Sequence, residues 1–150
     1  MTSAVRRNEL RFDVIREPWN EYELPDGSIL RVKHVLLRIF RIEEPEGRIS
    51  WETDVRSNVV LSHVPEGSKG PPSSVTYSHE QLRSQIVEHD VDYKTLSEEW
   101  NEYVLEDGTK IRIKFTVTRI SKTDKFDRRG EPIYVVEHAM IPRVILPRRP

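Results

Sequence analysis

The string Trp-Asn-Glu-Tyr occurs twice in the 150-residue chain, at residues 19–22 and again at residues 100–103. Aromatic rings beside amide and carboxylate groups could form a platform on which a ligand or a nucleic-acid base stacks. The alternative is packing, since a tryptophan and a tyrosine at the start of a hairpin usually fill the core of a small β unit. We favour packing and keep ligand binding as the second hypothesis.

Basic residues follow each string at the same spacing, as Arg31 and Lys33 and as Arg112 and Lys114. A basic sheet face that also carries aromatic residues is typical of nucleic-acid binding. Glutamates would stand opposite the arginines in the expected hairpins, however, and such cross-strand pairs are routine in sheets and would neutralise part of the face. The candidate interaction surface draws on both copies: Trp19, Arg31, Lys33, Arg38, Trp100, Arg112, Lys114 and Arg119.

Groups that could perform catalysis or bind a metal do not form a recognisable motif. The chain has no cysteine, and its 5 histidines show no metal-ligand spacing. His34 falls at an inward position of a predicted strand, where a hydrogen-bonded core histidine is expected. Asp26 and Asp107 both precede a glycine and are the one pair that could build a centre between two copies, but turn chemistry explains each better. We expect no enzyme activity, no catalytic residue, no cofactor and no metal site.

The two strings belong to a longer internal repeat. A shift of 81 residues aligns 12 identical residues among the 23 positions from 17 to 39. Unrelated segments of this length would share about one or two, so the duplication of one unit explains the match. The match fades beyond Ile42.

Each copy predicts a long strand. In the second copy, apolar residues at 111, 113, 115 and 117 alternate with polar residues, which is the pattern of a strand with one buried face. Shorter strands are expected before and after it. The predicted fold class is therefore mainly β: a tandem duplication of a small antiparallel β-barrel or sandwich unit, with two such units packed together because one alone buries little apolar surface.

A hairpin leads into each long strand, because Asp-Gly between alternating segments is a strong turn signal. With a three-residue loop, Glu21 faces Arg31 and Tyr22 faces Leu30. This register puts Tyr22 on the inward face and Trp19 on the outward face, where a cation-π contact between Trp19 and Lys33 is expected.

Residues 66–89 separate the two units. Their first part is rich in Gly, Pro and Ser, which is typical of a linker. Ser78 and Gln81 have the spacing of a capping box, and the apolar residues that follow predict a short helix at about 79–89. The expected organisation is a first β unit at 1–65, a linker with the helix at 66–89, and a second β unit at 90–150.

The formal net charge of -1 provides no overall attraction to nucleic acid or to an anionic membrane. The sequence has neither a secretory signal pattern nor an apolar stretch that approaches a membrane span, so we expect a cytoplasmic protein without a membrane partner. The leading hypothesis is a non-enzymatic structural or protein-interaction module built from two equivalent β units, which binds a protein partner or self-associates as an oligomer. The alternative is a nucleic-acid-binding protein that uses the basic strand faces of both repeats.

Overall fold

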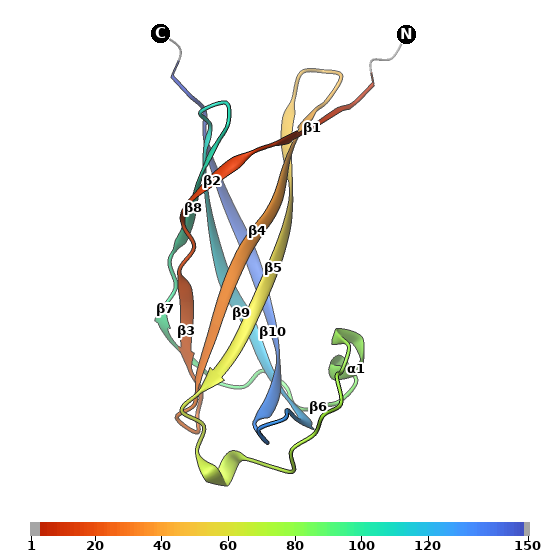
Figure 1. Ribbon diagram of the computed structural model, residues 1–150, viewed down its shortest axis with the longest axis vertical. Coiled ribbons are helices and arrows are strands. Elements are labelled where there is room, and N and C mark those ends of the chain that lie inside the picture. Colours follow the sequence, from red (N-terminus) through yellow and green to blue (C-terminus); the bar gives the residue numbers. More distant parts are fainter. Residues whose placement is uncertain (1–3, 149–150) are drawn as a thin grey trace.

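The computed structural model describes residues 4–148 and consists mainly of strands in two antiparallel sheets (Figure 1). Sheet A is made of the strands that join β4 or β3: β1 (Arg6–Leu10), β3 (Trp19–Glu23), β4 (Ile29–Glu43), β5 (Ile49–Ser62) and β7 (Lys94–Ser97). Sheet B is made of the strands that join β9 or β8: β2 (Phe12–Arg16), β6 (Ile86–Glu88), β8 (Trp100–Leu105), β9 (Lys110–Phe126) and β10 (Pro132–Ile145). The prediction of a mainly β fold is confirmed.

The hairpin between β3 and β4 has the predicted register. Glu21 pairs with Arg31 and Tyr22 pairs with Leu30, and the N–H of Leu24 donates to the carbonyl of Ser28 at 2.9 Å. Gly27 adopts φ 90° in the turn, a left-handed conformation that glycine reaches without a steric penalty. The hairpin between β8 and β9 is built in the same way, so the Asp-Gly signal located both turns.

The core lies between the two sheets, and both of its clusters contain side chains from both sheets. One cluster joins Leu36 and Ile39 of sheet A to Tyr103 and Phe115 of sheet B. The other joins Tyr22, Leu24, Leu30 and Val32 of sheet A to Val117 and Ile120 of sheet B. Alternation along β3, β4, β8 and β9 supplies most of these inward residues, and burying them is the main stabilising contribution.

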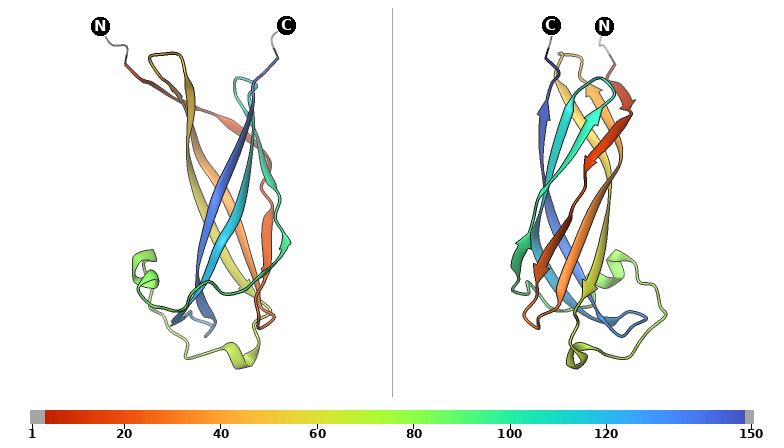
Figure 2. Two further views of the ribbon diagram at one scale, coloured as in Figure 1. Left: turned by 180° about the vertical axis from the view of Figure 1, so that it is seen from behind. Right: turned by 60° about the vertical axis from the view of Figure 1, so that its left-hand side comes forward.

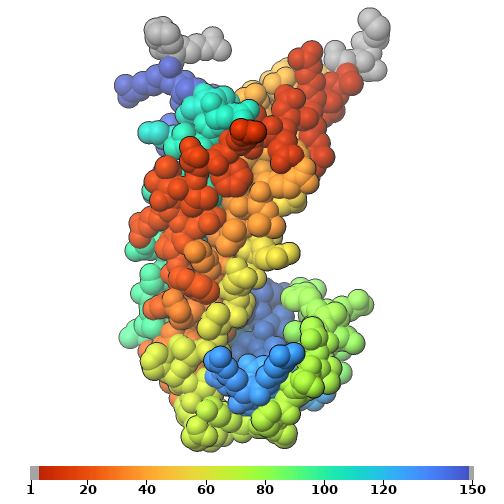
Figure 3. Space-filling view, viewed as in Figure 1, coloured from red at the N-terminus to blue at the C-terminus, as the bar shows by residue number. Residues whose placement is uncertain are grey.

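Two short strands cross from one sheet to the other. The chain leaves β1 in sheet A, pairs β2 with β8 of sheet B, and returns to sheet A as β3. In the second half, β6 pairs in sheet B, β7 pairs with β3 of sheet A, and β8 returns to sheet B. Figure 3 shows the N-terminal strands running obliquely over this face of the molecule. Each sheet therefore includes one strand from the other half of the chain, which the sequence pattern did not reveal.

The opposite side of the molecule is open. Within residues 4–148, β5 pairs only with β4 and β10 pairs only with β9, so the two sheets do not close into a barrel. Of the predicted barrel or sandwich, a closed barrel is thus not formed. The long hairpins β4–β5 and β9–β10 cross each other, and their outer edges stay unpaired within the described residues (Figures 1 and 2).

The connection between the halves contains a 3-10 turn (Glu66–Ser68) and one α-helix, α1 (His79–Arg83). The predicted capping box is confirmed, since Ser78 Oγ accepts from the N–H of Gln81 at 3.1 Å and the Gln81 side chain accepts from the N–H of Ser78 at 2.8 Å. The helix is shorter than the predicted 79–89, because Ile86 and Glu88 instead pair with β9 as strand β6. No helix in the described part of the chain has the length and apolar character needed to cross a membrane.

Candidate interaction surfaces

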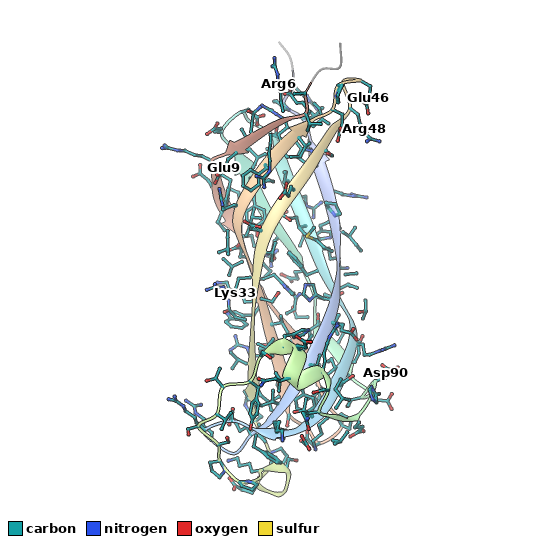
Figure 4. All side chains as sticks on the ribbon, turned by 90° about the vertical axis from the view of Figure 1, so that its right-hand side faces the viewer. Arg6, Glu9, Lys33, Glu46, Arg48 and Asp90 are labelled. Atoms are coloured by element: carbon teal, nitrogen blue, oxygen red, sulfur yellow. The ribbon has the colours of Figure 1, made fainter. Side chains whose placement is uncertain are left out.

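The eight predicted surface residues lie on the two outer faces. Trp19, Arg31, Lys33 and Arg38 belong to sheet A, and Trp100, Arg112, Lys114 and Arg119 belong to sheet B. The shared core lies between these faces, so the structure brings the residues together in two groups of four. Figure 4 shows Lys33 pointing away from the body of the molecule.

Both tryptophans are covered by an arginine that also pairs with a glutamate. The Arg31 guanidinium lies 4.5 Å from the centre of the Trp19 ring, and its Nε is 3.2 Å from Glu21 Oε1. In sheet B, Arg112 lies 4.8 Å from the Trp100 ring and its Nε is 3.1 Å from Glu102 Oε1. The predicted cross-strand ion pairs are confirmed. The predicted contact of Trp19 with Lys33 is replaced by Arg31, whose longer guanidinium-bearing side chain reaches diagonally over the ring.

Glutamates also neutralise the remaining two arginines of the predicted surface. Arg38 Nη2 donates to Glu9 Oε1 at 2.7 Å and its Nε donates to Glu9 Oε2 at 3.1 Å. Arg119 Nε lies 3.7 Å from Glu137 Oε2. Bidentate pairs such as Arg38–Glu9 hold a guanidinium in one geometry, which limits its use for another anion.

Sheet B nevertheless carries, near its tryptophan, basic residues that form no ion pair in the described part of the chain. Arg143 of β10 lies 5.8 Å from the Trp100 ring, on the side of Arg112. Within residues 4–148, Lys110, Lys114 and Arg143 form no ion pair. Arg143 was not among the predicted surface residues, although it is a basic residue at the start of the apolar C-terminal segment.

The duplicated string has a structural role that is shared between the sheets. Along one edge of β4, the pairing with β3 ends at Lys33 and the pairing with β1 begins at Ile39. The β4 backbone between these two residues therefore lacks a neighbouring strand on this edge. The carbonyl of His34 accepts from Asn101 Nδ2 at 2.9 Å, and the N–H of Leu36 donates to Glu17 Oε2 at 2.8 Å. Tyr103 Oη donates to the same Glu17 oxygen at 2.7 Å. Side chains thus replace the missing strand.

The corresponding gap in β9 is filled from the first half of the chain. Asn20 Nδ2 donates to the carbonyl of Phe115 at 3.3 Å, while the N–H of Val117 and Tyr22 Oη donate to Glu98 at 3.3 and 2.7 Å. Buried backbone groups must be paired, and the recurrence of Glu, Asn and Tyr at equivalent positions is explained by this need. The packing hypothesis for the string therefore applies to Asn and Tyr, while the tryptophans lie outside.

His34 lies in the core between the two gaps, as its inward position predicted. Its ring is stacked on Phe115 with centres 4.1 Å apart, and His34 Nδ1 is 2.8 Å from Ser57 Oγ. His34 Nε2 is buried and has no hydrogen-bond partner within residues 4–148. Burial and the nearby His138 lower the pKa of His34 to about 4, against a smaller opposite effect of Glu98. Burial also lowers the pKa of His138.

Asp26 and Asp107 lie in turns at opposite ends of the molecule (Figure 1). Asp26 Oδ1 accepts from the N–H of Ser28 at 2.9 Å, and Asp107 Oδ1 accepts from the N–H of Thr109 at 2.9 Å. Although burial acts in the opposite direction, these hydrogen bonds hold the pKa of each carboxyl below its usual value. The two groups cannot act at one centre. Besides their turn bonds, Asp107 Oδ2 accepts from Arg41 Nη1 at 2.6 Å and Asp26 Oδ2 accepts from Ser68 Oγ at 2.8 Å.

The open side presents two long strand edges that sequence reasoning did not single out. β5 and β10 each contain 14 residues and lie at the outer edge of their sheets. Several apolar side chains on these strands are between 38% and 48% exposed: Ile49, Val59, Met140 and Val144. Figure 4 views this side of the molecule, with β5 in yellow and β10 in blue. Unpaired edges with apolar side chains are sites at which another strand can add.

In the described part of the chain, no group of three or more His, Cys, Asp or Glu residues is placed to hold a metal ion. Comparison of the chain with protein-family models, with curated proteins and with solved structures found no match.

Proposed function

We propose that this chain is a non-enzymatic, cytoplasmic protein-interaction module, in which two equivalent β units together present the open side to a protein partner. The observation that carries the proposal is the pair of 14-residue edge strands, β5 and β10, with half-exposed apolar residues. Soluble proteins usually blunt long strand edges, so edges left open over this length are suited to binding another chain.

The tandem repeat supports the view that the units are equivalent. β3 and β8 begin at Trp19 and Trp100, and β4 and β9 begin at Ile29 and Lys110, both pairs being separated by the 81 residues of the sequence repeat. Both halves also follow the same route, with a short strand that crosses to the other sheet. A duplicated unit places its two edge strands on the same side, which gives a partner two neighbouring edges.

Site-specific photo-crosslinking in the native host tests the proposal. A photoreactive residue replaces Val59 or Val144 on the open side, and in matched controls it replaces Lys33 or Lys114 on the outer faces. We expect protease-sensitive adducts from positions 59 and 144, and weaker ones from the controls. Adducts that arise only at positions 33 and 114, or that are removed by nuclease, would contradict the proposal.

Nucleic-acid binding is the second candidate, and one observation favours it: Trp100 lies beside both Arg112 and Arg143 on a face where Lys110 and Lys114 form no ion pair within residues 4–148. A base could stack on such a face while the cations contact phosphates. Titration of labelled single-stranded DNA at about 50 and 200 mM salt tests this. Arg143→Val, which copies Val60 of the other unit, should weaken binding and flatten the salt dependence, and absence of binding at the lower salt concentration excludes this candidate.

A further inference from the structure

The edge of β5 has a defined set of free hydrogen-bonding groups. The backbone N–H of Leu24 donates to the carbonyl of Ser28 in the turn before β4, and the N–H of Glu44 donates to the carbonyl of Arg48 in the turn after it. Along an antiparallel ladder, hydrogen-bonded residue pairs alternate with pairs that form no hydrogen bond. Counting from either turn, the even-numbered residues of β5 direct their N–H and C=O groups toward β4. The odd-numbered residues from Ile49 to Leu61 therefore direct theirs outward, where no strand within residues 4–148 accepts them.

The open edge of β10 is interrupted at one position by a proline, whereas the edge of β5 is not. Leu105 bonds to Thr109, and the same alternation leaves the even-numbered residues near the end of β10 facing outward. One of these is Pro142, which has no N–H to donate and is typical of guarded edge strands. β5 contains no proline, glycine or lysine from Ile49 to Ser62. The difference identifies β5 as the edge that is better able to pair along its whole length.

The sequence of β5 is complementary to itself in one antiparallel register. When Val55 faces Val55 of a second copy, Asp54 faces Arg56 and Arg56 faces Asp54. The same register sets apolar residues opposite each other: Ile49 with Leu61, and Trp51 with Val59. Every residue with outward groups then meets another such residue, so the hydrogen bonds as well as the side chains are matched.

Neighbouring registers lack this match. Centring the pair on Thr53 sets Glu52 against Asp54 twice, which places like charges directly opposite each other. Centring it on Ser57 sets Arg56 against Asn58 and forms no ion pair. Centring it on Asp54 pairs Glu52 with Arg56 twice but sets Asp54 against Asp54, and centring it on Arg56 sets Arg56 against Arg56. Among these registers only the one centred on Val55 forms two ion pairs without a like-charge contact, so the charges of β5 favour Val55 as the centre.

We infer that the chain forms a two-fold symmetric dimer in which β5 pairs antiparallel with β5 of a second copy, with the axis at Val55. The dimer joins two copies of sheet A into one continuous sheet and covers the exposed side chains of Ile49 and Val59. This inference rests on the proposed interaction function and names its partner as a second copy of this chain. Antiparallel self-pairing of an edge strand is a closed, isologous contact, so it ends at the dimer.

Sedimentation analysis of the full chain over a concentration series tests the dimer. We expect the wild-type chain to dimerise, and we expect Asp54→Arg and Arg56→Asp to weaken self-association by about tenfold or more, because each sets like charges opposite each other twice. A 1:1 mixture of the two variants should recover association as a heterodimer, since two arginines of the first variant then face two aspartates of the second. This recovery is the sharpest test, because among the registers compared only the one centred on Val55 then forms two ion pairs without a like-charge contact.

A second pair of variants tests the backbone. Val59→Pro removes an outward N–H, as Pro142 does in β10, and should yield a folded monomer, while Val59→Thr keeps the N–H and should remain dimeric. Circular dichroism checks that the proline variant is folded, and the charge exchange decides the question if it is not. A monomeric wild-type chain, or a dimer unaffected by charge reversal, overturns the inference. In that case crosslinks from positions 59 and 144 to a different protein would still support the interaction module, so the two proposals fail separately.

Discussion

His34 and Phe115 are separated by 81 residues in the sequence, and their rings stack with an angle of 10° between the planes. The separation equals the shift of the internal repeat, so the two residues occupy equivalent places in the two units. The present pair joins an apolar ring to an ionisable one, and this difference gives the core a dependence on pH.

The stability of the protein should fall as the pH decreases from about 6.5 to about 4. The pKa of His34 is lowered from its ordinary 6.5 to about 4 in the folded state, chiefly by burial. In that range the unfolded chain binds a proton that the folded chain does not, so protonation favours unfolding. The full shift corresponds to about 3 kcal/mol of unfolding free energy, present above pH 6.5 and lost as the pH falls toward 4.

Denaturant unfolding at a series of pH values measures this dependence. His34→Phe, which sets phenylalanine at both equivalent positions, should remove a large part of the loss between pH 6.5 and 4, and part of the remaining loss is expected from His138, whose pKa is also lowered by burial. His79→Asn on α1 serves as the control and should follow the wild-type curve. If the unfolding free energy falls with decreasing pH equally steeply in the wild type and in His34→Phe, His34 is not the group that titrates.

The tyrosine hydroxyls of the duplicated string should each contribute to stability through the glutamates that they contact. Tyr22→Phe leaves Glu98 without its 2.7 Å donor, and Tyr103→Phe does the same to Glu17. We expect each substitution to lower the free energy of unfolding by about 1–3 kcal/mol, the range for a hydrogen bond to a partly buried charged group. Thermal and denaturant unfolding give the values.

Tyr134→Phe is the matched control for these substitutions. Tyr134 is a core-facing tyrosine whose hydroxyl forms no hydrogen bond within residues 4–148, and burial raises its pKa to about 12. Its loss should change stability by less than about 0.5 kcal/mol. A loss as large as those at Tyr22 and Tyr103 would contradict the role of the two glutamates.

Local pattern predicted the hairpins and the inward faces, and long-range pairing accounts for what it missed. The register of Tyr22 with Leu30 follows from a turn of known length and strict alternation, both local properties. The sequence of β2 would alternate in the same way whether the strand joined the sheet of its own half or the other sheet. The pairing of Phe12 with Leu105 could therefore not be predicted. The hydrogen bond of Asn101 to the backbone of His34 was hidden for the same reason.

The turn aspartates should act on stability and not through a shared centre. Asp26→Ala and Asp107→Ala each remove an acceptor for the backbone of the turn, and each should cost about 1 kcal/mol of unfolding free energy. The asparagine variants keep an acceptor oxygen at the same place. Asp26→Asn should recover most of the loss, and Asp107→Asn should recover less, because the ion pair of Asp107 with Arg41 at 2.6 Å is lost. The two losses should add in the double alanine variant, because the turns lie far apart. A double-variant loss that differs clearly from the sum would show that the two turns interact.

Neither half of the chain should fold without the other. Sheet A lacks β7 when residues 90–150 are removed, and sheet B lacks β2 when residues 1–65 are removed. Both core clusters also lose their contacts across the sheets, and Tyr22 and Asn101 lose the partners that they hold in the other half. We therefore expect fragments 1–65 and 66–150 to be unfolded alone and to gain strand signal in circular dichroism when mixed. A fragment that alone gives a cooperative thermal transition and dispersed amide resonances would show that the strand exchange between the halves is dispensable for folding.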